Sequence, residues 1–288
     1  MRRHTYEAEM HRTRPYKLIN FKYARQFSRM KNYIQEVPPI LDRMVYQSGK
    51  DLDGGGMRFK CLDPATSENL EVTMVPILYP EDEQELYDMT QTLIGRHHIN
   101  LVRIIDYSAH QMRHFNMTGY AAVDERVGLL VTNRPEGPFV KEFIAQNFKE
   151  LENTTLRDYF VQIFGGLHFM HRDGLVHRNI HPECVVMDLP QPEPQVDSDD
   201  EGGYAAMQRG KFRDPNIRPR LGDFWFLHNP RAPGCTFSEG RADWGFAPTA
   251  PPEVQGGHRI SDKSDVYALG VCVYYWITGA YPDLEKKS

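Results

Sequence analysis

The spacing of apolar residues predicts three helices in the body of the chain. Residues 81–96 and 154–170 repeat apolar positions every three or four residues, which is typical of amphipathic helices. In the second of these, Thr154 or Thr155 is a candidate helix cap. The run from Val266 to Ile277 is apolar around most of a helix and suits a buried core helix, because it is too short to span a bilayer.

Shorter apolar runs between turn residues predict strands. Residues 44–78 contain two or three such runs around a glycine cluster at 54–56, and residues 120–132 form another β-rich stretch. Residues 174–188 are predicted to form a helix end at Gly174, a short strand, a polar loop and an apolar β run at 185–187. This last segment therefore presents polar side chains from a loop between two strands.

The first segment of the chain has a basic amphipathic pattern. Apolar residues recur at helical spacing from position 19 to 34, and Lys22, Arg25 and Arg29 gather on another face. Residues 1–35 hold nine Lys or Arg against Glu7 and Glu9. We consider a helix that docks on the protein's own body or on a partner, a binder of RNA or an anionic lipid surface, and a mitochondrial transit peptide. The two glutamates count against the transit peptide.

Overall composition indicates a soluble or peripheral globular protein. Its 40% hydrophobic and 25% charged residues argue against disorder of the whole chain, and a net charge of −5 gives no global reason to expect nucleic acid binding. The four cysteines have no paired spacing, so neither a zinc site nor a disulfide scaffold is predicted. We expect no transmembrane segment and an intracellular location, either cytoplasmic or mitochondrial.

Residues 189–219 form an insertion of biased composition. The first half is proline-rich and acidic and the second half is basic, which favours a disordered surface loop. Ser198 lies among acidic residues and is a candidate phosphorylation site.

Four short motifs occur in order along the second half of the chain: HRN at 177–179, DFW at 223–225, PPE at 251–253 and SDVYALG at 264–270. Their order and spacing resemble the landmarks of the protein kinases, and the resemblance covers about residues 45–285. It implies an α+β, two-lobed protein kinase-like fold. The tripeptide HRD at 171–173 is not the catalytic motif, because it precedes the glycine at the end of a helix.

The resemblance also implies a domain organisation. Residues 1–43 form the basic N-terminal extension, 44–135 a β-rich N-lobe with the hinge, and 136–288 a mainly helical C-lobe with the insertion at about 189–219. The C-lobe is expected to be shortened after helix F. A face of that helix, with Tyr275 and Trp276 as candidates, is then expected to be uncovered unless the N-terminal helix, the insertion or another protein covers it.

Several positions depart from the kinase pattern. Asn179 stands at the catalytic base, His181 at the adjacent lysine and Cys184 at the metal-binding asparagine. In the N-lobe, the strand-3 lysine position falls at Val75 and the helix-C glutamate at Met89, with Asp88 or Glu85 as the alternatives under a shift. The degenerate positions are Val75, Met89, Asn179, His181, Cys184 and Trp225, which replaces the DFG glycine.

The hinge departs from the family as well. Thr132 takes the gatekeeper position, and Pro135 takes the position whose backbone N–H usually binds adenine, although proline has no N–H. Asp223 keeps the metal-ligand position. The structural positions His177, Phe224, Glu253 and Asp265 are also kept, and Asp265 is expected to brace the catalytic-loop backbone.

From these substitutions the sequence predicts an inactive pseudokinase that is not an enzyme, has no ATP or Mg²⁺ cofactor, and serves as a protein-interaction or scaffold subunit within a larger assembly. The first alternative is an atypical nucleotide-binding kinase, in which Lys50 or Lys60 reaches the phosphates or Asp223 and His181 supply a non-standard mechanism. The second is a ribonucleoprotein subunit, such as a ribosomal one, whose residues 1–35 contact RNA.

Overall fold

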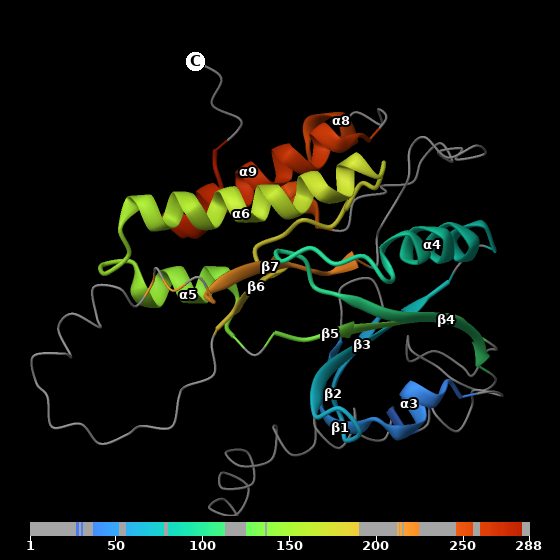
Figure 1. Cartoon of the computed structure of the whole chain (residues 1–288). Helices are drawn as coiled ribbons and strands as arrows, with labels where there is room; N and C mark the ends of the chain where they lie inside the picture. The colour runs from blue at the N-terminus through green and yellow to red at the C-terminus, as the bar shows by residue number, and fades with distance from the viewer. Residues whose placement is uncertain are drawn as a thin grey trace, which may run out of the picture. The chain divides into compact units, whose positions relative to one another are not determined.

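The computed structural model describes residues 27–28, 30, 37–51, 56–77, 80–112, 125–135, 137–189, 212, 214, 216–224, 246–255 and 260–283 (Figure 1). The chain divides into two compact units. The first comprises residues 1–87 and 104–134, and the second comprises residues 88–103 and 135–288. The described part of the first unit is mainly strands and that of the second mainly helices, which is the α+β composition that the sequence predicts.

The first unit contains an antiparallel sheet of five strands in the order β1-β2-β3-β5-β4. The strands are β1 (Val45–Asp51), β2 (Met57–Asp63), β3 (Glu68–Pro76), β4 (Ile104–Met112) and β5 (Glu125–Asn133). The first three strands lie where the apolar runs predict them. The glycine cluster expected between β1 and β2 falls largely outside the described residues, as do residues 113–124 before β5.

One face of this sheet packs into a hydrophobic core. Alternate residues of β2, β3 and β5 point to it, because successive side chains of a strand lie on opposite faces. The short helix α3 (Pro39–Arg43) adds Leu41, and the helical residues Phe27 and Met30 are also buried in this core. Phe27 contacts Phe59 edge to face, with 5.3 Å between ring centroids.

These contacts bear on the interpretation of the N-terminal segment. Two of its predicted apolar positions, Phe27 and Met30, pack on the body of the chain, as the self-docking interpretation requires. The basic positions Lys22, Arg25 and Arg29 lie outside the described residues. Binding of a partner, of RNA or of lipid by this segment stays a prediction.

The opposite face of the sheet carries Arg58, Lys60, Glu71, Thr73, Val75 and Thr132.

Helix α4 (Pro80–Leu93) belongs to the first unit up to Tyr87, which packs against Tyr107 of β4 at 6.4 Å between ring centroids. The helix begins one residue before the predicted start and ends at Leu93 rather than at residue 96.

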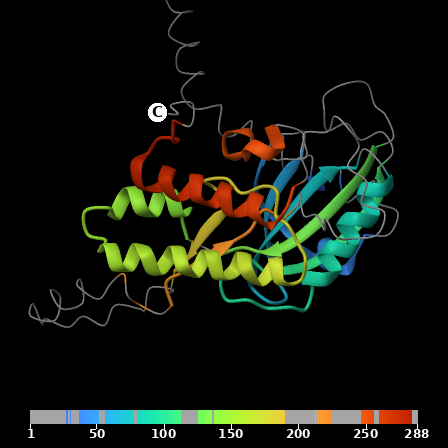
Figure 2. The ribbon, with the colours of Figure 1, turned by 90° about the horizontal axis from the view of Figure 1, so that it is seen from above.

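The second unit contains α5 (Val140–Asn147), α6 (Asn153–Arg172), β6 (Val185–Asp188), β7 (Arg218–Leu221), the 3-10 turn η2 (Ala247–Thr249), α8 (Pro252–Gln255) and α9 (Asp262–Thr278). Helices α6 and α9 lie side by side in both views (Figures 1 and 2). Strands β6 and β7 pair in an antiparallel ladder from Val185↔Leu221 to Asp188↔Arg218. The insertion lies between these two strands and falls largely outside the described residues.

The loop after α4 belongs to the second unit. The side-chain amide of Asn100 donates to the carbonyl of Pro219 at 3.1 Å, and Val102 N donates to Leu221 O at 2.8 Å. Gly166 of α6 permits this packing, because a Cβ there would lie 2.8 Å from Asn100 O.

Two local predictions were wrong. Trp276 is not uncovered: it is 4% exposed, stacks on Phe160 of α6, and donates its indole N–H to Pro182 O at 3.0 Å. The exposed apolar stripe of α9 consists instead of Val266, Tyr274 and Ile277. The predicted threonine caps also fail, because α6 starts at Asn153 and its N-cap residue, Glu152, makes no side-chain capping bond.

The described residues include no helix with enough length and apolar character to cross a bilayer. Cys61, Cys184 and Cys272 are buried free thiols, and Cys235 lies outside the described residues.

We predict that Phe27→Ala lowers the free energy of unfolding by about 3 kcal/mol or more, because it removes a buried aromatic ring from the core and leaves a cavity. Val45→Ala is the matched control in the same unit, since Val45 is 51% exposed, and its effect should stay below about 1 kcal/mol. Chemical denaturation measures both changes. Equal effects of the two substitutions would mean that the N-terminal segment does not pack on the sheet.

Candidate functional site

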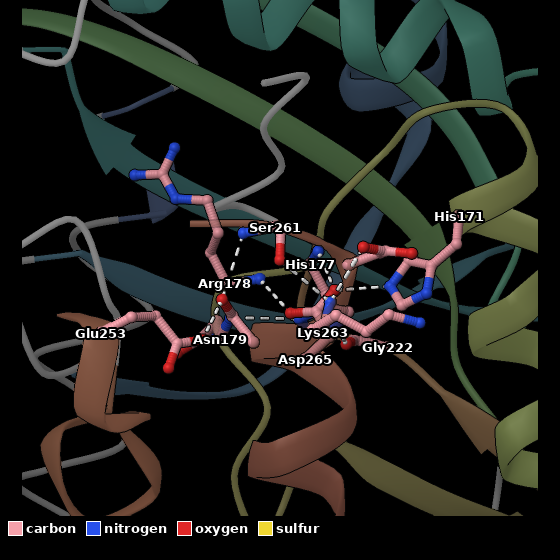
Figure 3. Close-up of polar contacts among 11 residues, drawn as sticks. His171, His177, Arg178, Asn179, Gly222, Glu253, Ser261, Lys263 and Asp265 are labelled. Carbon is pink, nitrogen blue, oxygen red and sulfur yellow. Dashed lines mark hydrogen bonds and ion pairs between the residues drawn. The ribbon is translucent and has the colours of Figure 1, made fainter. Parts of the chain in front are cut away.

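The polar loop at 177–184 is held by a buried carboxylate in the first turn of α9. Asp265 is 0% exposed, and its two oxygens accept hydrogen bonds from His177 N at 2.7 Å and Arg178 N at 2.9 Å. The side chain of His171, at the end of α6, contacts the same carboxylate through Nε2 at 2.8 Å (Figure 3). Three bonds and the start of a helix offset the cost of burying this charge.

Helix α9 begins at this point because of a capping box. Ser261 Oγ accepts from Lys263 N at 3.2 Å, and Ser261 N donates to Ser264 Oγ at 3.1 Å. The hydroxyl of Ser264 in turn donates to Glu253 of α8 at 2.6 Å. Glu253, one of the positions that the family resemblance implies to be structural, is thus bound by a serine hydroxyl.

His177 connects the loop to the strand that follows the insertion. Its Nδ1 accepts from Asn179 N at 3.2 Å, so Nε2 carries the proton and donates to Gly222 O at 2.6 Å. Burial lowers the pKa of His177, although Asp265 acts in the opposite direction. The neutral ring packs against Phe224 at 5.5 Å between centroids, which places Phe224 beside the loop.

Asp223 is held by His181. The imidazole Nδ1 accepts from Glu183 N at 3.2 Å, so the Nε2–H donates to the Asp223 carboxylate at 2.5 Å. Both ring nitrogens are occupied in this conformation. His181 therefore orients Asp223 and is not free to accept a proton from a substrate.

Two residues of this region have strained backbones. Arg178 has φ 64° and Asp223 has φ 66°, which is the left-handed region that non-glycine residues rarely adopt. Such a conformation costs about 1–3 kcal/mol per residue and persists only where its surroundings enforce it. Arg178 is bound through its backbone N–H, and Asp223 through its carboxylate. Strain of this kind, next to a set of fixed polar groups, is typical of functional sites.

The structure tests whether these residues fit a metal ion. Asp223 offers a carboxylate, whereas Cys184 is 2% exposed and burial raises the pKa of its thiol to about 12, so it stays neutral and is a poor ligand for hard Mg²⁺. Within the described ranges, no group of three or more His, Cys, Asp or Glu side chains is arranged so that it could hold a metal ion by itself. The site fits one Mg²⁺ held by a single carboxylate together with water and ligand phosphates.

The family resemblance puts Asn179 at the position of the catalytic base. It is 4% exposed, and its backbone N–H is bound to His177. Its amide can accept a hydrogen bond and so orient a hydroxyl group, but it cannot take up a proton as a carboxylate does.

In the first unit, Val75 is 5% exposed and lies over Gly128, where an added Cβ would be 3.4 Å from Val75 Cγ2 and 3.1 Å from Tyr107 Oη. The position implied for the strand-3 lysine is thus filled by apolar packing. Met89 is buried as well, at 5% exposure. Asp88 and Glu85 are the alternatives to Met89 for the helix-C glutamate position. Asp88 is exposed and Glu85 is partly buried.

An acidic residue of α4 that the sequence did not single out does have a basic partner. Glu83 accepts two hydrogen bonds from the guanidinium of Arg126 on β5, at 2.7 and 2.5 Å. The guanidinium lowers the pKa of Glu83. No sequence signal identifies this pair, because the two residues lie 43 positions apart.

The hinge offers few backbone donors to a base. Arg134 N donates to Asn69 O at 2.9 Å, and Pro135 has no N–H. Thr132, at the gatekeeper position, is 6% exposed. Trp225 lies outside the described residues.

We predict that Asp265→Asn lowers the free energy of unfolding by about 2–4 kcal/mol, because one acceptor oxygen is replaced by an NH₂ group that faces the loop N–H donors. Asp158→Asn is the control, since the Asp158 side chain is 60% exposed. Thermal denaturation measures both. Stability unchanged by Asp265→Asn would contradict a bracing role for Asp265.

Comparisons with known proteins agree on one family. The family model described as a protein kinase domain matches residues 81–288. The serine/threonine-protein kinase PKZ1 of Phytophthora infestans is 30% identical over 169 residues, which cover 58% of this chain and 38% of that protein. Aurora kinase B of Danio rerio is 26% identical over 186 residues, or 63% of this chain and 47% of that protein.

A probable serine/threonine-protein kinase of Clostridium acetobutylicum is 23% identical over 242 residues, which cover 82% of this chain and 30% of that protein. The chain thus spans less than half the length of these three relatives.

These findings correct two predictions from the sequence. The chain was expected not to be an enzyme, but the family match and relatives named as kinases point to a kinase. It was also expected to lack a cofactor, whereas the proteins of this family normally use ATP and Mg²⁺. Both predictions rested on the replaced side chains alone. They did not consider the contacts that hold Asp223 beside the 177–184 loop. The match of the protein kinase domain model to more than half of its residues establishes that the chain belongs to the protein kinase family.

Proposed function

We propose that this chain is a protein kinase of non-standard type, which binds ATP with Mg²⁺ and transfers the γ-phosphoryl group slowly to a protein hydroxyl. The observation that carries the proposal is the Asp223 carboxylate, which His181 holds at 2.5 Å beside a loop that Asp265 fixes. An ordered acidic group of this kind is what an Mg²⁺-nucleotide requires from the protein.

Asp223 is the residue that would hold the metal in this proposal, with phosphate oxygens and water as the other ligands. Bound Mg²⁺ would neutralise the charge that develops on the phosphoryl group during transfer. His181 keeps the carboxylate in place, because its own two nitrogens are fixed by Glu183 N and by Asp223. Cys184 adds no ligand, which leaves a single metal position.

The rate should be low because Asn179 replaces a general base. General base catalysis contributes about 10²–10⁴-fold to a typical rate. Phosphoryl transfer, however, depends mainly on positioning and electrostatic stabilisation, so the loss of a base lowers the rate without removing the chemistry. Asn179 would orient the substrate hydroxyl group through its amide oxygen.

The class of substrate follows from the relatives. Several of them are named as serine/threonine-protein kinases, which favours serine or threonine hydroxyl groups as the acceptors. Because the chain covers less than half of these proteins, its substrates and partners are part of the proposal.

Protein interaction is a second candidate function, and it is compatible with catalysis. The observation that favours it is the exposed apolar stripe of α9, where Val266, Tyr274 and Ile277 are 41–46% exposed. Exposed apolar groups gathered on one helix are more typical of a binding surface than single scattered ones. An RNA-binding arm at residues 1–35 stays a prediction, since these residues lie almost entirely outside the described ones.

We predict that ATP with Mg²⁺ stabilises the protein against thermal unfolding, by about 2.7 kcal/mol at a ligand concentration of one hundred times Kd. Asp223→Ala should remove the part of the stabilisation that depends on Mg²⁺, since it deletes the proposed metal ligand. Asp158→Ala, on the exposed side of α6, should leave the shift unchanged. The proposal fails if the wild-type protein shows no shift with saturating ATP and Mg²⁺.

We predict that restoring the replaced catalytic groups raises the transfer rate. Asn179→Asp with Cys184→Asn returns a proton acceptor and a second oxygen ligand, so single-turnover transfer from γ-labelled ATP should rise by about 10²-fold or more. Asn153→Asp is a control that changes the same chemical group at an exposed position at the start of α6. A double variant that folds and binds ATP without any gain in rate would contradict the roles given to positions 179 and 184.

A further inference from the structure

A series of aromatic rings extends from the 177–184 loop to the residues that follow α9. Between ring centroids, His181 lies 5.6 Å from Phe246, and Phe246 lies 6.4 Å from Tyr281. Tyr281 in turn stacks on Tyr275 of α9 at 4.6 Å. All four residues belong to the second unit. We call Phe246, Tyr275 and Tyr281 the aromatic cluster, and His181 connects this cluster to Asp223.

The end of α9 brings the two tyrosines together. The helix ends at Thr278, and Gly279 follows with φ 75°, in the left-handed region that glycine adopts without strain. Gly279 N donates to Tyr275 O at 2.8 Å, so the chain turns back directly after the helix. Tyr281 therefore lies against Tyr275 instead of continuing away from it.

The 3-10 turn η2 holds the third ring of the cluster against the loop. Phe246 is the residue before this turn, and its carbonyl accepts a hydrogen bond from Thr249 N at 3.1 Å. The buried hydroxyl of Thr249 donates to Ile180 O at 2.5 Å. These bonds fix Phe246 beside His181. The cluster is thus positioned by the same loop that holds Asp223.

The aromatic cluster is accessible and neutral. Tyr281 is 39% exposed, and Phe246 and Tyr275 are partly exposed. Partial burial raises the pKa of Tyr281 to about 12, so its hydroxyl stays neutral at physiological pH. The carboxylate of Glu183, which acts on the pKa of Tyr281 in the same direction, is bound by Lys141. The surface beside the loop therefore presents rings and an ion pair to a ligand.

An apolar side chain is the kind of ligand that this surface fits. Tyrosine rings provide large contact areas at a low cost in conformational freedom. A charged side chain, in contrast, would have to compete with the existing pair between Lys141 and Glu183. The cluster also continues directly from the proposed site of transfer, because His181 contacts both Asp223 and Phe246. A ligand on the cluster therefore lies close to the place that the acceptor hydroxyl group has to occupy.

We propose that the aromatic cluster binds an apolar side chain of the protein substrate, within a few residues of the serine or threonine that receives the phosphoryl group. This inference rests on the proposed function and names a feature of its substrate. Tyr281 has the most exposed ring of the cluster, so it determines this specificity most directly. Leucine, methionine and phenylalanine fit the description, because each places a large apolar group against an aromatic ring.

Phosphoryl transfer to a set of synthetic peptides tests this inference. Each peptide has one serine in an alanine and glycine background, with phenylalanine, alanine, lysine or glutamate at one of the four nearest positions on either side. Transfer is measured from γ-labelled ATP with Mg²⁺, and fluorescence anisotropy measures the binding of labelled peptides without nucleotide. At one position, phenylalanine should raise both transfer and affinity by about tenfold over alanine, as partial burial of a large apolar side chain implies.

Two substitutions of Tyr281 separate the ring contact from other effects. Tyr281→Ala should reduce the ratio of transfer to the phenylalanine peptide over the alanine peptide to near one. Tyr281→Phe keeps the ring and should keep the ratio. Phe148→Ala removes a ring of similar exposure, 48%, at the end of α5, and should also keep the ratio. The unfolding temperature of each variant verifies that it is folded.

Three results would overturn the inference and leave the proposed function standing. The first is transfer that does not distinguish phenylalanine from alanine at any position. The second is a preference for phenylalanine that Tyr281→Ala leaves unchanged. The third is a preference for lysine that exceeds the one for phenylalanine, which would mean that Glu183 exchanges Lys141 for a cation of the substrate.

Failure of the proposed function gives a different result. Peptide binding is measured without nucleotide, so it does not depend on transfer. Binding of the phenylalanine peptide that depends on Tyr281, without transfer to any peptide, would support the apolar binding surface and overturn the proposed function. Neither transfer to nor binding of any peptide would overturn both.

Discussion

The buried carboxylate of Asp265 is the interaction on which the second unit's site depends. It binds two backbone N–H groups of the 177–184 loop and the side chain of His171, and so joins the ends of α6 and α9 to that loop. The same loop holds Gly222 through His177, and it holds Asp223 through His181. A substitution of Asp265 would therefore disturb the position of Asp223, the proposed metal ligand, although Asp265 itself contacts no reacting group.

The molecule retains the framework of its family while several of the side chains that act on phosphates are exchanged. By the family resemblance, Val75, Asn179 and Cys184 stand at the positions of a cation, a base and a metal ligand, and the structure shows Asp223 held beside an ordered loop. Phosphoryl transfer tolerates such exchanges better than most reactions, because it is promoted mainly by positioned charge.

The sequence predicts much of the fold because the signals for it are local. Alternation of apolar residues places β1, β2 and β3, and the apolar stripes place α4 and α6 to within a few residues. The order of the motifs identifies the family and directs attention to Asp223. The substitutions alone, however, led to the wrong expectation of a protein without enzymatic activity or cofactor. The contacts that hold Asp223 and the 177–184 loop in place cannot be read from the sequence.

The features that the sequence did not reveal are contacts between distant residues. The pairs Glu83–Arg126 and Glu253–Ser264, the burial of Trp276 and the contact of His171 with Asp265 all depend on how elements pack. The tautomers of His177 and His181 likewise depend on backbone N–H groups that only the folded loop brings to their rings. No periodicity or motif encodes such contacts.

The most direct test of this account is a single-turnover measurement of phosphoryl transfer from γ-labelled ATP, with protein in excess and with or without Mg²⁺. The account predicts slow transfer to serine or threonine hydroxyl groups that requires Mg²⁺ and is lost in Asp223→Ala. ATP that binds with Mg²⁺ but is not turned over above the uncatalysed rate would contradict it.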